Sequence, residues 1–159
     1  RLERAKRFLE KMIRELKGDR IGLIYFAGDA YLQMPLTNDY AAAELFVKSA
    51  NPTLAGTQGT AIDEAIDLAM KAYEEEVRHQ RALIIITDGE DHEGKAVAKA
   101  REGVEDGLVI FTVGVGTEAG TYVPYINRGT AEYKKDEEGN PVISKLNVEN
   151  LQNLANDGQ

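Results

Sequence analysis

Two hydrophobic periodicities alternate along this chain, one typical of amphipathic helices and the other of buried strands. Between residues 2 and 16, apolar positions recur every three or four residues with Arg, Lys and Glu between them, which predicts a helix with one inward face. Residues 82–87 are instead an unbroken, mostly β-branched apolar run without polar alternation. This second pattern predicts a strand covered on both faces, as in a mainly parallel sheet between helices. The run stops at Asp88 and Gly89, where the glycine allows a sharp turn.

The same two patterns divide most of the remaining chain. Strands are predicted at residues 21–27, 30–36 and 108–115, and helices at 40–49, 60–73, 94–104 and from Asn147 onward. Pro35 makes the second of these an edge strand, because proline cannot donate to a ladder, and Leu45 and Phe46 are expected to face inward from their helix. The alternation of strands and helices predicts an α/β fold with a Rossmann-like, mostly parallel sheet flanked by helices. Residues 117–145 depart from the alternation, and we expect them to form an excursion ending in a β-hairpin within a single domain over residues 1–159.

Composition limits the classes of partner and cofactor. The 159 residues carry a formal net charge of -8, and no basic stripe offsets it, which argues against nucleic acid as the partner. The sequence has no cysteine, so disulfides and thiolate-bound zinc or iron–sulfur clusters are excluded. No apolar run approaches the roughly 20 residues that span a bilayer. The acidic balance is compatible with cation binding.

Three common enzyme motifs are incomplete or absent in the sequence. Gly114, Gly116 and Gly120 follow a predicted strand as in a dinucleotide fingerprint, but the third glycine comes one residue late and no helix follows it. There is no Gly-Lys-Ser/Thr phosphate loop and no Gly-x-Ser-x-Gly elbow, and neither histidine has an obvious nucleophile to serve. Phosphoryl transfer through Asp88 and Glu90, two positions apart after a strand, stays open as an alternative.

Asp88 and Thr60 carry the clearest candidate chemistry. In open α/β sheets, ligands bind outside the carboxyl ends of the strands, which is where Asp88 is expected. Thr60 opens a predicted helix after Gly59, and two roles are open for it. With Asp63 it could form a capping box, worth about 1 kcal/mol. Alternatively, its hydroxyl is an oxygen ligand for a hard cation, because threonine and aspartate oxygens select Mg²⁺, Mn²⁺ or Ca²⁺ over softer metals.

Taken together, three stretches resemble the von Willebrand factor type A domain. They are residues 59–66, which open a helix, residues 87–90 at the end of a strand, and residues 110–116 in a later strand. Residues 25–39 are similar to the bacterial aerotolerance-operon proteins of the BatA/BatB type. The resemblance extends over nearly the whole chain.

The resemblance implies a function and a location. Proteins of this family use a metal-ion-dependent adhesion site, in which a divalent cation, usually Mg²⁺, captures a carboxylate of a protein partner. Thr60 and Asp88 match the threonine and the aspartate of that site, and Thr57 and Glu90 are weaker candidates. The resemblance therefore implies a non-enzymatic interaction domain whose partner offers an acidic residue. It also implies a membrane-anchored bacterial parent protein, with this domain outside the bilayer on the periplasmic side and the chain itself soluble.

One motif of the family does not occur in this sequence. The Asp-x-Ser-x-Ser loop, which in the family follows the first strand, is missing. We therefore expect a fragment that lacks the first and last strands of the fold, with an incomplete site that binds metal weakly or not at all. Because bare strand edges tend to pair with other chains, we expect either self-association or filling of the gap by another segment, for example the hairpin at residues 130–144. An assembly module with a vestigial metal site is the remaining alternative.

Overall fold

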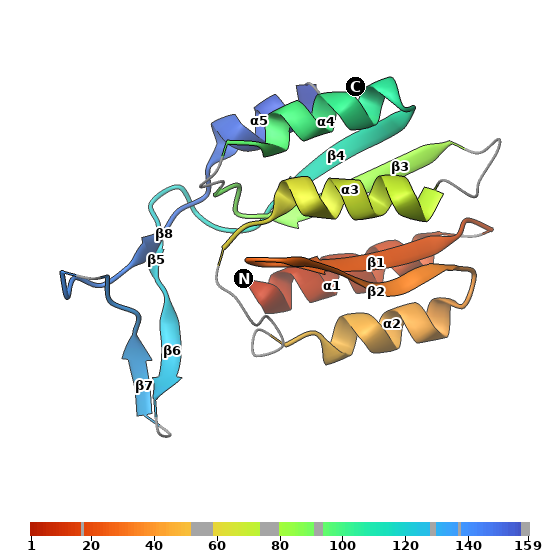
Figure 1. Ribbon diagram of the computed structural model, residues 1–159. Coiled ribbons are helices and arrows are strands. Elements are labelled where there is room, and N and C mark those ends of the chain that lie inside the picture. The colour runs from red at the N-terminus through yellow and green to blue at the C-terminus, as the bar shows by residue number, and fades with distance from the viewer. Residues whose placement is uncertain are drawn as a thin grey trace.

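The protein is an α/β structure of five helices and eight strands over the part of the chain that is described. The computed structural model describes residues 1–16, 18–51, 59–73, 80–90, 94–127, 130–136 and 138–156 (Figure 1). In chain order, the elements are α1 (Leu2–Glu15), β1 (Ile21–Phe26), β2 (Ala30–Thr37), α2 (Tyr40–Ser49), α3 (Ile62–Tyr73), β3 (Arg81–Thr87), α4 (Ala96–Glu105), β4 (Leu108–Gly114), β5 (Thr121–Tyr122), β6 (Pro124–Asn127), β7 (Thr130–Tyr133), β8 (Ile143–Ser144) and α5 (Val148–Asn156). The α/β class predicted from the sequence is confirmed.

The strands pair two by two rather than in one continuous sheet. β1 pairs with β2 antiparallel, and β3 pairs with β4 parallel, with Arg81 opposite Leu108 and Thr87 opposite Gly114. Among the described residues, no backbone ladder joins β1 to β3. A cavity of about 2250 Å³ is lined by the inner face of α1 and by β1 and β3. In place of one mostly parallel sheet, the described residues form an antiparallel half, β1–β2, and a parallel half, β3–β4.

The larger hydrophobic core lies on one face of β3–β4. Leu83 lies opposite Ile110 in the β3–β4 ladder, and Ile85 is two positions from Leu83 and so shares its face. Ile85 and Ile110 therefore point together toward the helices. This core joins three helices to the two strands, and its buried members are Ile62, Ile66, Ile85, Ala96, Ala100, Leu108, Ile110 and Leu154. On the opposite face, Ile84 is 36% exposed and Phe111 is 47% exposed. The prediction that residues 82–87 are covered on both faces is wrong for the described part of the chain, since no described helix shields these two side chains.

A second, smaller core holds α1 and α2 against β1–β2. Its buried members are Ile13, Met34, Ala43 and Val47. The prediction that Leu45 faces inward is wrong, because Leu45 is 67% exposed and Val47, two residues on, takes the buried position. Phe46, by contrast, packs against this core. Helix α3 contacts both β1–β2 and β3 and so connects the two halves of the molecule.

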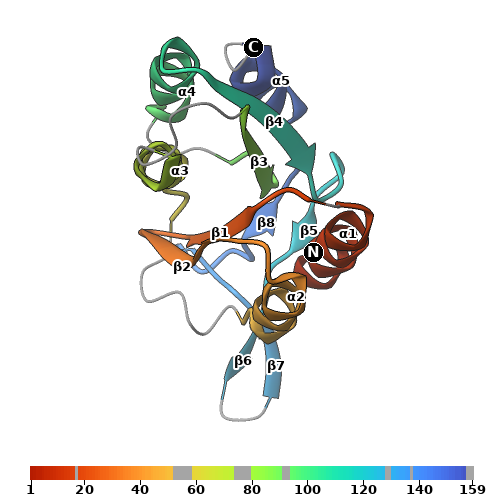
Figure 2. The same ribbon diagram turned by 90° about the vertical axis from the view of Figure 1, so that its right-hand side faces the viewer.

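Residues 121–144 form two short ribbons beyond the two halves. β5 pairs with β8, and β6 pairs with β7, both antiparallel. The β6–β7 ribbon projects away from the helices and from β1–β4 in both views (Figure 1 and Figure 2). As a strand between β1 and β3, the hairpin at residues 130–144 is not found among the described residues, because β7 and β8 pair with β6 and β5 instead. The excursion does reach the cavity, and the residues that line it there are Thr121, Tyr122, Val123, Lys134, Val142, Ile143 and Ser144.

Candidate metal-binding rim

Asp88 is placed by a tight turn at the carboxyl end of β3. The backbone N–H of Val115 donates to the Thr87 carbonyl at 2.9 Å, and that of Asn147 donates to the Asp88 carbonyl at 2.8 Å. These bonds hold the strand end between β4 and the start of α5. Gly89 follows with φ at +79°, and a Cβ built there would lie 2.5 Å from the Asn147 carbonyl oxygen. A glycine is required here, because any side chain would push α5 away from the turn.

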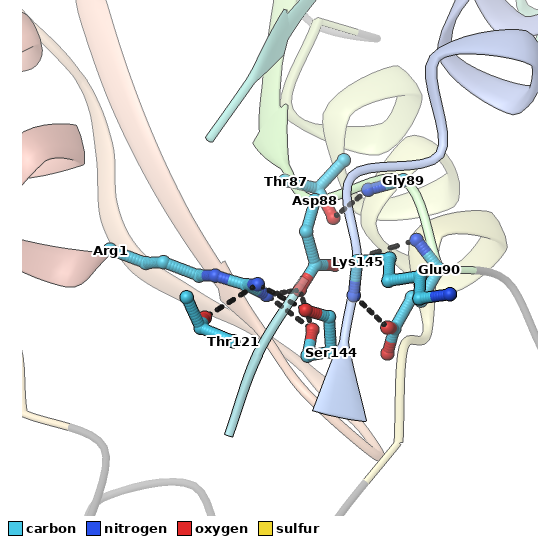
Figure 3. Close-up of polar contacts among 8 residues, drawn as sticks. All are labelled: Arg1, Thr87, Asp88, Gly89, Glu90, Thr121, Ser144 and Lys145. Atoms are coloured by element: carbon cyan, nitrogen blue, oxygen red, sulfur yellow. Dashed lines mark hydrogen bonds and ion pairs between the residues drawn. The ribbon is translucent and has the colours of Figure 1, made fainter. Parts of the chain in front are cut away.

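The Asp88 carboxylate is bound by side chains from two distant segments. Its Oδ2 accepts a hydrogen bond from Arg1 Nη1 at 2.7 Å and another from Ser144 Oγ at 2.9 Å (Figure 3). Its Oδ1 faces the backbone N–H of Glu90 at 3.4 Å. The side chains of Arg1 and Asp88 are 28% and 24% exposed, so solvent reaches part of this ion pair. The charge of Asp88 is thus balanced within the chain.

Thr60 lies at the same end of the molecule as Asp88. The start of α3 and the end of β3 are at one edge in Figure 1, and both residues line the cavity between the two halves. Thr60 is held there by a close approach of two backbones. The N–H of Ala61 donates to the Ala27 carbonyl at 2.6 Å, and a Cβ on Gly59 would lie 2.9 Å from the Cα of Gly28.

The capping box predicted as one role for Thr60 is wrong. Helix α3 begins at Ile62, so Thr60 lies one residue too early to be its N-cap. The carbonyl of Thr60 accepts the Ile62 N–H at 3.0 Å. That its hydroxyl is a cation ligand stays a prediction.

The weaker candidates have different outcomes. Glu90 lies beside Asp88, and its Oε1 accepts the backbone N–H of Lys145 at 3.1 Å, so this carboxylate ties the turn to the strand that returns from the excursion. Thr57 lies outside the described residues.

The sequence did not predict three residues that lie at this site. Arg1, Thr121 and Ser144 all converge near Asp88 (Figure 3). Arg1 is 87 positions and Ser144 is 56 positions from Asp88 in the sequence. The opposition of Thr121 and Ser144 comes from the β5–β8 register, which no local pattern reveals.

The arrangement of these residues decides how well they fit a divalent cation. Threonine and carboxylate oxygens are suitable donors, but Mg²⁺ and Ca²⁺ take about six or more oxygen ligands. Among the described residues, no three His, Cys, Asp or Glu side chains converge as a metal-binding group. The one carboxylate at the centre already pairs with a guanidinium at 2.7 Å. The described residues by themselves therefore do not fit a divalent cation.

Comparison with known proteins identifies the relatives of this fold. A family model of the von Willebrand factor type A domain matches residues 1–90. The crystal structure of BatB, a conserved hypothetical protein from Bacteroides thetaiotaomicron, is 44% identical, with a TM-score of 0.94, over 99% of this chain and 76% of that chain. An aerotolerance-related membrane protein from Bacteroides fragilis NCTC 9343 is 40% identical, with a TM-score of 0.93, over 99% of this chain and 77% of that chain.

More distant similarities extend only to the fold or to part of a longer protein. Proximal thread matrix protein 1 of the mussel byssus, in a structure with a zinc-occupied MIDAS motif, is 15% identical with a TM-score of 0.62, over 73% of this chain and 33% of that chain. An uncharacterized protein of Borreliella burgdorferi is 26% identical over 121 residues, which are 74% of this chain, and the chain spans only 35% of that relative's length. With more than half of its residues matched by the family model, the chain belongs to the von Willebrand factor type A domain family.

Proposed function

We propose that this chain is a non-enzymatic protein-interaction domain whose binding surface is the rim around Asp88. The observation that carries the proposal is the position of Asp88 at the carboxyl end of β3, beside the start of α3 with Thr60 (Figure 1). Exposed rims at strand ends are where α/β folds bind their ligands. Membership of the von Willebrand factor type A family supports an interaction role.

The finer form of this proposal is capture of an acidic side chain of a protein partner through a divalent cation. Thr60 and Asp88 would hold the cation, and Mg²⁺, Mn²⁺ or Ca²⁺ suits their oxygen atoms. When bound, such a cation supplies an open coordination position for a partner's carboxylate. Two protein ligands are too few, so metal dependence is expected only where further oxygen ligands are supplied. For these 159 residues alone, we expect weak Mg²⁺ binding or none.

The alternatives differ in how well the contacts support them. Phosphoryl transfer would use Asp88 as nucleophile with Glu90 beside it, yet Asp88 is paired with Arg1 and Glu90 binds a backbone N–H. These contacts support a non-enzymatic role. The Arg1–Asp88 ion pair favours a second candidate, an assembly module that binds its partner without metal.

We further propose that the parent protein is anchored in a bacterial membrane, with this domain outside the bilayer on the periplasmic side. The similarity to an aerotolerance-related membrane protein supports this location. In the residues that the structure describes, every helix is too short or too polar to cross a bilayer.

The test is affinity capture from a bacterial membrane extract with and without a chelator. Asp88→Asn removes the charge at the rim, whereas the matched control Asp106→Asn removes the partner of Arg81 at the opposite end of β3. We expect Asp88→Asn to lose the protein that the wild-type chain captures and Asp106→Asn to retain it. Loss on chelation supports the metal-dependent form, and retention supports the assembly module. Equal capture by Asp88→Asn and the wild type would contradict a rim centred on Asp88.

A phosphatase assay with a generic substrate tests the enzymatic alternative. We expect no turnover above that of the Asp88→Asn variant. Turnover that depends on Asp88 would mean that the chain is an enzyme.

A further inference from the structure

The guanidinium of Arg1 is surrounded by oxygen atoms from three separate segments. Its Nη1 donates to Asp88 Oδ2 at 2.7 Å and also to Ser144 Oγ. Its Nη2 donates to the Ser144 carbonyl at 2.6 Å and to Thr121 Oγ1 at 3.2 Å. Both terminal nitrogens are thus saturated with acceptors, and the acceptors come from the end of β3 and from the β5–β8 ribbon (Figure 3).

Gly116 lies beside this guanidinium. A Cβ built on Gly116 would meet Arg1 Cζ at 3.5 Å and Nε at 3.6 Å. A Cβ at this position would thus make ordinary van der Waals contact, so Gly116 lies beside the guanidinium and leaves it room. We refer to Asp88, Gly116, Thr121 and Ser144 as the guanidinium pocket.

The chemistry of the guanidinium pocket suits a planar monovalent cation better than a hard divalent one. The pocket supplies one carboxylate charge and spreads its acceptors over both terminal nitrogens, which matches the fixed fork of an arginine side chain. Guanidinium is weakly hydrated and so enters a partly buried pocket at little cost, whereas Mg²⁺ gives up its water reluctantly and demands octahedral ligands. The single carboxylate and the spread of the acceptors thus explain both why the pocket fits Arg1 and why it does not fit a divalent cation.

We propose that the guanidinium pocket is an arginine-binding site and that Arg1 is its resident ligand. A cation carried by the protein itself then neutralises Asp88 in place of a divalent metal. Through it, Arg1 joins the start of α1 to β3 and to the β5–β8 ribbon. A divalent cation that is to reach Asp88 must first displace Arg1. This inference stands independently of any protein partner.

Chemical rescue tests the proposal on the 159-residue chain. In Arg1→Ala the pocket is emptied, and we expect the melting temperature to fall by about 3 °C or more. Millimolar methylguanidinium should restore at least half of that loss, whereas MgCl₂ or methylammonium at the same ionic strength should not. The matched control is Arg7→Ala, which removes an exposed arginine from helix α1, whose N-cap residue is Arg1. Arg7→Ala should melt like the wild type and should not respond to methylguanidinium.

A second variant keeps the test decisive if Arg1→Ala does not fold. Arg1→Lys retains the charge but loses the planar fork, so we expect it to melt below the wild type. Equal melting of Arg1→Lys and the wild type would overturn the guanidinium specificity. A wild-type melting temperature in Arg1→Ala, or its rescue by MgCl₂ in preference to methylguanidinium, would overturn the proposal. Because the readout is stability, its failure is distinguishable from failure of the partner-binding function.

Discussion

Replacing Gly89 by alanine tests whether the turn that presents Asp88 is packed as tightly as the structure indicates. With φ at +79°, an alanine costs about 1 kcal/mol of backbone strain. Its Cβ would lie 2.5 Å from the Asn147 carbonyl oxygen and 2.9 Å from Leu151 Cγ, both of them on or beside α5. Relieving that overlap adds about 1–3 kcal/mol. It also stretches the 2.8 Å hydrogen bond from Asn147 to the Asp88 carbonyl. We therefore expect Gly89→Ala to lower the free energy of unfolding by about 3 kcal/mol.

The assay is urea unfolding followed by far-ultraviolet circular dichroism, with Gly107→Ala as the control. Gly107 also has a left-handed φ, of +88°, but a Cβ there would meet nothing within 4 Å. It reports the backbone strain alone, so a loss of about 1 kcal/mol is expected. If the two variants lose the same stability, the close contact of the Asp88 turn with α5 is refuted, and so is the position we give to the rim.

Three further changes test the core and the pH dependence of stability. Ile66 is 0% exposed in the larger core, so Ile66→Ala should cost about 3 kcal/mol in urea unfolding, and a loss below 1 kcal/mol would contradict its burial. Hydrogen bonds from Arg14 and Lys48 hold the pKa of Glu44 below its ordinary value. The stability that Glu44 adds is therefore present above that value and lost as the pH falls, and Glu44→Gln should flatten the stability curve between about pH 5 and 3. Burial raises the pKa of Tyr73, so its contribution is present below about pH 10 and is lost at higher pH as the unfolded chain ionises first. Tyr73→Phe should remove that loss of stability at alkaline pH. If the pH midpoint of alkaline unfolding is the same in Tyr73→Phe and in the wild type, the role of Tyr73 is contradicted.

Helix α2 illustrates how far the hydrophobic pattern reaches. Its start follows from the N-cap residue Asp39, whose Oδ1 accepts the Ala42 N–H at 2.9 Å. The apolar residues that follow predict the helix itself. Three consecutive apolar residues, Leu45 to Val47, span too wide an arc for all of them to face one core. Which of them is buried depends on the direction from which α1 and β1–β2 approach. The sequence therefore predicts the helix but not its buried face.

At the candidate rim, too, some features were predictable from the sequence and one was not. Asp88 at a strand end and Thr60 before a helix were predictable, because strand ends and helix starts are local features. Their common edge follows from the antiparallel course of α3 and β3, which Tyr73 secures by donating to the Ala82 carbonyl at 2.9 Å. The pairing of Asp88 with Arg1 was not predictable, because nothing in the local pattern relates positions 87 residues apart.

By itself, then, the sequence determined where the five helices and strands β1–β4 lie and where carboxylate and hydroxyl oxygens adjoin them, because periodicity, glycines and caps act over a few neighbouring residues. Only the tertiary structure decided which strand edges bond, which face of β3–β4 is covered and which positive group meets Asp88. The physical reason is that pairing and charge neutralisation depend on the relative positions of whole elements, which are decided by how their buried faces pack together.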